Sequence, residues 1–179
     1  MVAGNDIPFV ANVPTEEIFT LPDRMAVDGQ VTATRPFNYG GNTVDGMTLT
    51  FAGGKVTRFT ALRGEGILRE LLQTDEGSSR LGEAALVPNS SPVSRLGATF
   101  HNILFDENAS CHLAFGDAYR FSLRDAASLT DEEFAARGGN HSHVHTDFMI
   151  GSGNLDIDGI LADGSAQPLL RGGEGAFDV

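Results

Sequence analysis

The sequence predicts a single α+β domain, spanning residues 1–179, with a mostly antiparallel or mixed sheet and a few short helices. The chain of 179 residues is long enough to bury one sizeable core. Short alternating runs separated by glycine pairs, which are typical of antiparallel strands, occupy residues 25–62. A helical apolar pattern follows at residues 66–73, and later apolar runs carry acids and histidines at their edges.

Charge and cysteine content exclude several classes of partner. The 12 basic and 24 acidic residues give a net charge of −12, which repels phosphate backbones, so we expect no nucleic-acid partner. Cys111 is the single cysteine, so no internal disulfide can form, and no apolar run approaches the ~18 residues of a membrane span. The N-terminus lacks the basic and apolar regions of a signal peptide. We therefore expect a cytoplasmic protein with no membrane partner.

The first pair of residues with chemical interest is Glu16 and Glu17. Residues 8–10 are apolar and predict a first strand, and Pro14 then marks a turn. In one interpretation Thr15 caps a helix, and the two acids lie in its first turn, where negative charge is favoured. In the other, the adjacent carboxylates serve a metal site, one as a ligand and one as a proton acceptor. The pair alone does not decide between these interpretations.

An antiparallel sheet is predicted for residues 29–62. Apolar residues alternate with threonines over residues 47–51, and Gly53-Gly54 stands where the two-residue turn of a hairpin belongs. A helix is then predicted at residues 66–73, because its isoleucine and leucines follow the 3.6-residue spacing.

Glu83 stands at the start of an apolar run, residues 84–87, which Pro88 ends. An acid in that position needs a partner or solvent. It is therefore either the solvated end of a strand or a metal ligand. Residues 90–102 predict a connecting loop.

Residues 105–119 bring a carboxylate, an imidazole and a phenol into an otherwise apolar segment. If Asn108 caps a short helix, His112, Phe115 and Tyr119 fall on one helical face. Glu107 would then fold back towards His112 from the start of that helix. A divalent metal is the partner that suits these groups. The alternative is a packed helix with a half-buried histidine and a tyrosine at its surface.

Residues 140–148 carry histidines at alternate positions. As a strand, they place His141, His143, His145 and Asp147 on one face. The His145-x-Asp147 pair can present a nitrogen and one or two oxygens to a single cation. The alternative is a histidine-rich loop that leads into a core strand.

The remaining segments predict structure without ligands. Residues 129–137 predict a short capped helix at the surface. Residues 155–170 predict two strands around a turn, and Asp156 and Asp158 alternate with apolar residues there, so we expect both to face solvent.

Together, these acids and imidazoles suit two divalent cations bridged by a carboxylate, an arrangement that activates water for hydrolysis. The motifs that carry them are residues 12–20, 75–88, 104–116 and 145–160. In this order they resemble the thermophilic metalloaminopeptidase family, of the aminopeptidase T and aminopeptidase S type, from about residue 12 to residue 168.

The resemblance implies a dinuclear exopeptidase that removes N-terminal residues from peptides with a free N-terminus and forms a homodimer. It implies two zinc or cobalt ions per subunit, with magnesium or manganese as alternatives. The implied metal ligands are Glu17, Glu83, Glu107, His112, His145 and Asp147. Tyr119 falls at the position of the family's active-site tyrosine. Glu16 is the candidate general base, although the sequence does not settle which of Glu16 and Glu17 is base and which is ligand.

Family members carry an additional N-terminal domain, which this sequence lacks, so we expect the catalytic part alone. One alternative is a fragment that binds metal and dimerises but is inactive without that domain. Another is a structural domain whose acids and histidines are merely solvated, which predicts no stoichiometric metal.

Overall fold

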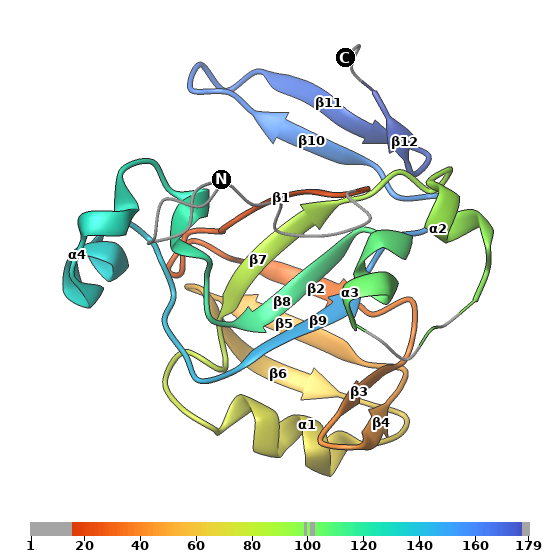
Figure 1. Cartoon of the computed structure of the whole chain (residues 1–179), viewed down its shortest axis with the longest axis horizontal. Helices are drawn as coiled ribbons and strands as arrows, with labels where there is room; N and C mark the ends of the chain where they lie inside the picture. Colours follow the sequence, from red (N-terminus) through yellow and green to blue (C-terminus); the bar gives the residue numbers. More distant parts are fainter. Residues whose placement is uncertain (1–15, 99, 101–102, 177–179) are drawn as a thin grey trace.

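The computed structural model describes residues 16–98, 100 and 103–176, and Figure 1 shows their arrangement. The strands are β1 (Ile18–Thr20), β2 (Gly29–Thr32), β3 (Phe37–Tyr39), β4 (Asn42–Val44), β5 (Thr48–Ala52), β6 (Lys55–Thr60), β7 (Leu81–Leu86), β8 (His112–Gly116), β9 (His145–Met149), β10 (Ile157–Ile160), β11 (Ala166–Arg171) and β12 (Glu174–Gly175). The helices are α1 (Glu65–Leu72), α2 (Pro92–Arg95), α3 (Ile103–Asp106) and α4 (Asp131–Ala136), with 3-10 turns η1 (Glu107–Ala109), η2 (Arg120–Ser122) and η3 (Ala126–Ser128). The α+β class with antiparallel sheets and short helices is confirmed. The strand expected at residues 8–10 and the cap expected at Thr15 lie outside the described residues.

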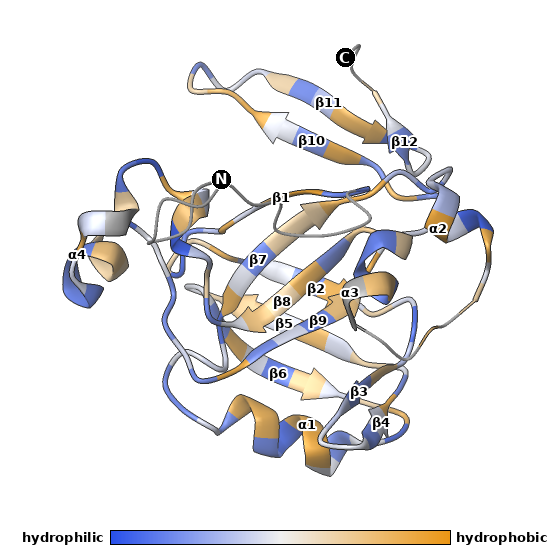
Figure 2. Ribbon diagram, in the orientation of Figure 1, coloured by the Kyte–Doolittle hydropathy of each residue, from blue (hydrophilic) through white to orange (hydrophobic). Residues whose placement is uncertain are grey.

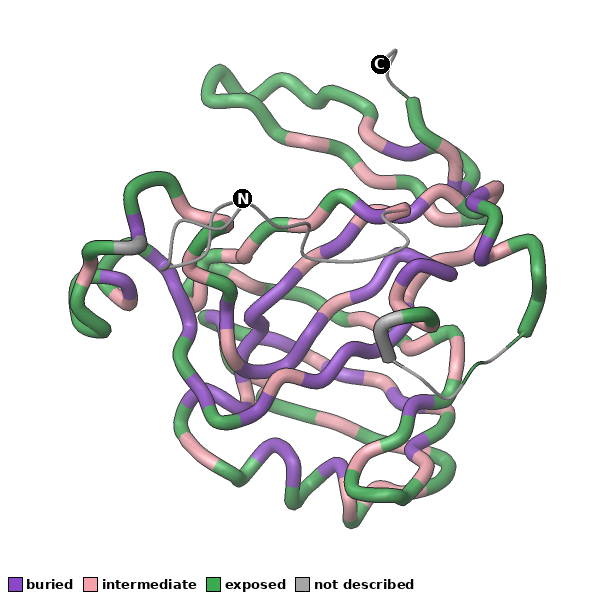
Figure 3. Tube along the Cα trace, in the orientation of Figure 1, coloured by how far each residue is buried: buried purple, intermediate pink, exposed green. Residues whose placement is uncertain are grey.

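The central sheet has the order β1-β7-β8-β9, and all its neighbours are antiparallel. Figure 3 shows β7, β8 and β9 as mostly buried strands. Side chains on one face of this sheet enter the core, and those of Phe115 and Phe148 contact each other there with ring centroids 4.6 Å apart. The other face is therefore left for polar groups.

The core lies between that sheet, the three-stranded sheet β2-β5-β6 and helix α1. The predicted hairpin is confirmed as β5 and β6, joined at Gly53-Gly54, and both glycines have positive φ, as a tight turn requires. The helix predicted at residues 66–73 is confirmed as α1. Its leucines at positions 68, 71 and 72 are buried. Figure 2 shows apolar and polar segments alternating along α1, as in an amphipathic helix.

The prediction of a helix over residues 108–119 is wrong. Residues 107–109 form the short turn η1, Ser110 is extended, and His112 begins strand β8. A short apolar run reads alike in a buried helix and in a central strand. Here β8 pairs with a strand on each side, and those two ladders satisfy its backbone more completely than an isolated helical turn would.

The C-terminal part forms a separate sheet, β10-β11-β12, which lies beside the main body in Figure 1. The predicted pair of strands is confirmed, and Asp156 and Asp158 are exposed as expected. The capped helix predicted at residues 129–137 is also confirmed: in α4, Thr130 and Glu133 form a reciprocal capping box. Residues 90–102, predicted as a loop, contain the one-turn helix α2.

None of the helices in the described part of the chain has the length and apolar character that crossing a bilayer requires.

Candidate metal centre

Three neighbouring strands place four of the predicted ligands on one face of the central sheet. Glu83 of β7 lies opposite Ala114 of β8, and Ala114 lies opposite Asp147 of β9. Directly opposed residues of antiparallel strands share a face, and so do residues two apart along one strand. His112 and His145 therefore join the same face, which is the one turned away from the aromatic core.

Two small residues make room for this cluster. Ala114 is fully buried between Glu83 and Asp147 and occupies little space beyond its Cβ. The register of β7 and β8 shifts between Leu81 and Glu83, at Gly82. A Cβ on Gly82 would lie 2.2 Å from the carbonyl oxygen of Asp117, so only glycine permits this approach. Such bulges re-aim side chains next to functional sites, and this one precedes Glu83 directly.

His112 is completely buried and its two ring nitrogens have different partners. Nδ1 lies 3.0 Å from the carbonyl oxygen of Ser110 and donates to it. Nε2 lies 3.2 Å from Oε2 of Glu17 and 3.3 Å from Oε1 of Glu83. A backbone carbonyl on one nitrogen fixes the tautomer that leaves the other free to bind a metal.

His145 repeats this arrangement at the other side of the cluster. Its Nδ1 lies 2.8 Å from the carbonyl oxygen of Asp117, and its Nε2 lies 3.5 Å from Oδ1 of Asp147 and 3.7 Å from Oε2 of Glu83. Glu83 therefore directs one oxygen towards each imidazole. A carboxylate in that position is suited to bridge two cations.

The side chains form two overlapping groups whose ligand atoms lie within 4.8 Å of one another, and His112 belongs to both. One group is Glu17, Glu83 and His112, and the other is Glu107, His112 and Asp147. Strand β1 brings in Glu17 from the N-terminal side, and the turn η1 brings in Glu107. The structure thus gathers Glu107 and His112 as expected, but across a turn and a strand instead of along one helix.

The donor set fits a divalent cation. Oδ1 of Asp147 is buried, and the described residues give it only one long contact with a donor, at 3.5 Å from Nε2 of His145. A buried carboxylate oxygen without a short hydrogen bond is costly unless a cation compensates it. The four carboxylates and two imidazoles of the cluster form a ligand set that suits zinc and similar borderline metals.

Burial and the neighbouring charges shift the pKa values of the ionisable groups in the cluster. Burial raises the pKa of Glu107 to about 8, and the charges of Asp147 and Glu17 add to the shift. Burial alone would lower the pKa of His112, but hydrogen bonds with Glu17 and Glu83 raise it well above its usual value. A divalent cation bound by these side chains would offset the excess of carboxylate charge and favour the deprotonated imidazoles.

The same balance acts on His145. Burial alone would lower its pKa, but the hydrogen bond with Asp147 and the charge of that carboxylate raise the pKa to about 9. In the metal-free chain His145 therefore carries a proton at neutral pH, and a bound metal has to replace it.

Tyr119 lies next to His145 and is partly exposed. Its ring centroid is 4.9 Å from that of His145, and it stacks on Phe121 at 5.1 Å with an edge contact from Phe19. The Tyr119 side chain is partly exposed, yet burial and the charges of Glu83 and Asp147 raise its pKa to about 12. Its hydroxyl group therefore keeps its proton and remains a hydrogen-bond donor.

Glu16, His141, His143 and His145 are not members of the two groups of candidate ligand atoms, although Nε2 of His145 faces Glu83 and Asp147. The backbone N–H of Glu16 donates to Oδ1 of Asn108 at 2.9 Å, and its chain continues into β1, so the capped helix considered for this segment does not start here. The prediction that His141 and His143 share a strand face with His145 is wrong, because β9 begins only at His145. Both outer histidines are exposed, since the backbone before β9 bonds to the carboxylates of Asp75 and Asp117 instead of to a neighbouring strand.

Sequence reasoning missed the groups that orient the two imidazoles. The acceptors are the backbone carbonyls of Ser110 and Asp117, and a backbone role leaves no residue-type signal in a sequence. The role of Ala114 also leaves no signal in the sequence, because an alanine in an apolar run has no reactive or polar group.

Comparisons with known proteins point to a family of metalloproteases. A family model described as thermophilic metalloprotease (M29) matches residues 1–174. Aminopeptidase 2 of Geobacillus stearothermophilus is 52% identical over 97% of this chain and 42% of its own length. Aminopeptidase T of Thermus aquaticus is 50% identical over 90% of this chain and 39% of its own length. The chain thus spans about two-fifths of the length of these relatives.

Solved structures show the same fold. The structure of wild-type AmpT from Thermus thermophilus matches with a TM-score of 0.90 and 45% identity, over 99% of this chain and 43% of that one. A 2,5-dihydroxypyridine dioxygenase from Pseudomonas putida KT2440 shares the fold at a TM-score of 0.54 and 16% identity, over 88% of this chain. The match to the family model covers nearly the whole sequence, and the chain belongs to the thermophilic metalloprotease family M29.

Proposed function

We propose that this chain is the catalytic part of a metal-dependent aminopeptidase, which removes N-terminal residues from peptides. One observation carries the proposal: buried carboxylates gather around His112 in two groups of potential ligand atoms, and Glu83, His112, His145 and Asp147 share one sheet face. The names of the relatives, which are aminopeptidases, support the exopeptidase class.

The proposed metal site holds two divalent ions, zinc or cobalt, with magnesium or manganese as alternatives. Six ligands exceed what one tetrahedral ion needs, which supports two ions. Glu83 is our candidate for the bridging carboxylate because it faces both imidazoles. The proposed ligands are Glu17, Glu83, Glu107, His112, His145 and Asp147.

The chemistry follows from what the side chains can do around a peptide carbonyl. When bound, two divalent ions supply a water whose pKa is lowered to ~7 and polarise the scissile carbonyl. Water attacks the carbonyl carbon, and a carboxylate, for which Glu16 is our candidate, takes its proton and passes it to the departing amine as the C–N bond breaks. Tyr119 keeps its proton at neutral pH and can donate a hydrogen bond to the oxyanion.

The net charge also favours an exopeptidase. A chain with a net charge of −12 attracts cationic groups, and the free α-ammonium group of a peptide is one. An acetylated peptide lacks that charge and should bind more weakly.

A second candidate function has its own support. The chain spans about two-fifths of its relatives' length, so the described site can bind metal without being sufficient for turnover. In that case the chain is an isolated metal-binding domain that dimerises and needs an additional N-terminal domain for activity. We also propose a homodimer and, because the thiol of Cys111 is unpaired, a reducing cytoplasmic setting.

Peptide hydrolysis tests the two candidates directly. The chain is loaded with zinc or cobalt and incubated with a short peptide whose N-terminus is free or acetylated, and products are identified by mass spectrometry. The aminopeptidase proposal predicts stepwise loss of N-terminal residues from the free peptide alone, and none after chelation. Stoichiometric metal without turnover would support the isolated domain, and internal cleavage of the acetylated peptide would contradict the exopeptidase proposal.

A further inference from the structure

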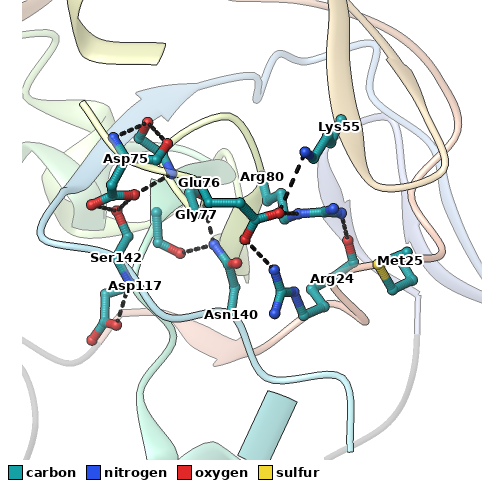
Figure 4. Close-up of polar contacts among 12 residues, drawn as sticks. Arg24, Met25, Lys55, Asp75, Glu76, Gly77, Arg80, Asp117, Asn140 and Ser142 are labelled. Atoms are coloured by element: carbon teal, nitrogen blue, oxygen red, sulfur yellow. Dashed lines mark hydrogen bonds and ion pairs between the residues drawn. The ribbon is translucent and has the colours of Figure 1, made fainter. Parts of the chain in front are cut away.

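The loop before β9, residues 140–144, is held by two other loops (Figure 4). Asn140 is fully buried, and its Nδ2 donates to the carbonyl oxygens of Gly77 at 2.8 Å and Gly116 at 2.6 Å. One side chain thus joins residues 75–78 and residues 116–117 to this loop. The loop leads directly into His145, so the position of the loop sets the position of the His145 backbone.

The contacts with the loop are too close for any residue but glycine. A Cβ on Gly77 would lie 2.0 Å from the carbonyl oxygen of His141. A Cβ on Gly116, which has a φ of 93°, would lie 2.0 Å from the carbonyl oxygen of Val144. The loop is therefore seated against both neighbours by direct backbone contact, with no side chain in between.

Asp117 links the loop to the imidazole through three bonds. Its N–H donates to the carbonyl oxygen of Val144 at 2.6 Å, and its Oδ1 accepts from the N–H of Ser142 at 3.0 Å. Its carbonyl oxygen accepts from Nδ1 of His145 at 2.8 Å. A shift of residues 142–144 would thus move the acceptor that orients His145, or break its bond.

Asp75 holds the same residues from the opposite side. Its carboxylate accepts from Oγ of Ser142 at 2.8 and 3.0 Å and from the N–H of His143 at 2.7 Å. Oγ of Ser142 in turn accepts from the N–H of Val144 at 3.1 Å. A further bond from the N–H of Ser78 at 2.8 Å fixes the carboxylate itself. The loop is therefore clamped between Asp75 and Asp117.

We propose that Asp75 is a positioning residue for the metal centre: by clamping residues 142–144 against Asp117, it fixes the Nδ1 bond of His145 and so aims Nε2 at the carboxylates. The inference rests on the proposed metal-dependent function. Partners that orient a metal ligand from outside its contact shell change metal affinity or activity by about 10–100-fold when they are removed.

The neighbouring acid provides a matched control. Glu76 pairs with Arg24, Lys55 and Arg80 on the other side of the same loop, as Figure 4 shows, and makes none of the bonds to residues 142–144 given above. Asp75→Asn and Glu76→Gln remove one negative charge each from adjacent positions. In Asp75→Asn the amide can no longer accept from both Ser78 and His143, because one of its two ends is now a donor.

Zinc affinity, measured by competition with a chelator, is the first readout, and the thermal midpoint of unfolding is recorded beside it. We expect Asp75→Asn to weaken zinc binding about tenfold or more, while Glu76→Gln keeps the wild-type affinity even if its midpoint falls. Ser142→Ala, a milder change that removes only the hydroxyl group, should weaken zinc binding in the same direction. If Asp75→Asn folds poorly, the zinc affinity of Ser142→Ala still tests the proposal.

The second readout needs no metal. In the metal-free chain, nitrogen-15 NMR should show a slowly exchanging Nδ1 proton on His145 in the wild type and in Glu76→Gln, and a faster exchange in Asp75→Asn. If the wild type binds no zinc but this difference persists, the proposed function fails and the positioning role stands. Wild-type zinc affinity and an unchanged His145 proton in both Asp75→Asn and Ser142→Ala would overturn the inference.

Discussion

Oε1 of Glu83 lies 3.3 Å from Nε2 of His112, and both side chains are buried. The other oxygen of the same carboxylate faces His145, so this one residue touches both halves of the cluster. Because the loss of even an outer partner costs about 10–100-fold in metal affinity, the loss of this proposed ligand should cost at least about 100-fold. We expect Glu83→Gln to show that loss in a zinc titration. The exposed carboxylate of Glu65, on the surface of α1, provides the control: Glu65→Gln should bind zinc as the wild type does, and equal affinity in both variants would refute the assignment.

The histidines before β9 provide a second comparison. His145 joins the cluster through Nε2, whereas His141 is exposed and bonds to the side chain of Asp117 at 2.9 Å. We expect His145→Ala to abolish cobalt- or zinc-dependent release of N-terminal residues, and His141→Ala to keep most of the activity. A peptide-release assay on the zinc- or cobalt-loaded chain checks both. Undiminished turnover of His145→Ala would show that His145 is not a metal ligand needed for activity.

The pH dependence of the metal-free chain follows from two raised pKa values. His145 titrates at about 9 when folded and Glu107 at about 8, both above their ordinary values. A group whose folded pKa is raised contributes stability below its unfolded pKa, and that stability is lost as the pH rises through the folded value. We therefore expect the thermal midpoint of the metal-free chain to fall between pH 7 and pH 9. Bound zinc should remove this fall, because metal replaces the protons.

Glu107→Gln is the control for that experiment. At pH 7 the Glu107 carboxyl is mostly protonated, so the amide should change the midpoint little, whereas at pH 9 the variant should be more stable than the wild type. A midpoint that rises or stays constant from pH 7 to pH 9 in the metal-free wild type would contradict the coupling among these groups.

Ala114 tests whether the space in the cluster matters. The residue is buried between Glu83 and Asp147, so the two extra methyl groups of Ala114→Val would enter the space between the carboxylates. We expect zinc affinity to fall, with an overpacking cost of about 1–3 kcal/mol in the free energy of unfolding. Ala84, the next residue along β7 after Glu83, points to the other face, so Ala84→Val should leave zinc binding intact. Titration and denaturant unfolding of both variants measure the difference, and equal zinc affinity in both would show that the space is not needed.

Local patterns predicted the elements whose signals lie within a few residues. The hairpin of β5 and β6 and the helix α1 follow from alternation, a glycine pair and 3.6-residue spacing. The segment after Asn108 was predicted wrongly, because its short apolar run suits either a helix or a central strand. Pairing with β7 and β9, which lie far away in the sequence, decides the outcome.

The candidate ligands were predicted from residue types and from the family resemblance. The structure places four of them on one sheet face and brings in Glu17 from the residue before β1 and Glu107 from η1. Their support could not be predicted. The acceptor for His145 is the backbone carbonyl of Asp117, and Asp75 acts through hydrogen bonds to a loop 67 residues away from it in the sequence. Such contacts depend on how the chain folds back on itself, and a single sequence does not encode them in any local pattern.

Anomalous diffraction from crystals of the zinc-loaded chain, recorded on both sides of the zinc absorption edge, tests the central claim most directly. The account predicts two zinc peaks per chain, both within the cluster of Glu17, Glu83, Glu107, His112, His145 and Asp147. Absence of anomalous density in that cluster, or peaks confined to the exposed His141 and His143, would contradict it.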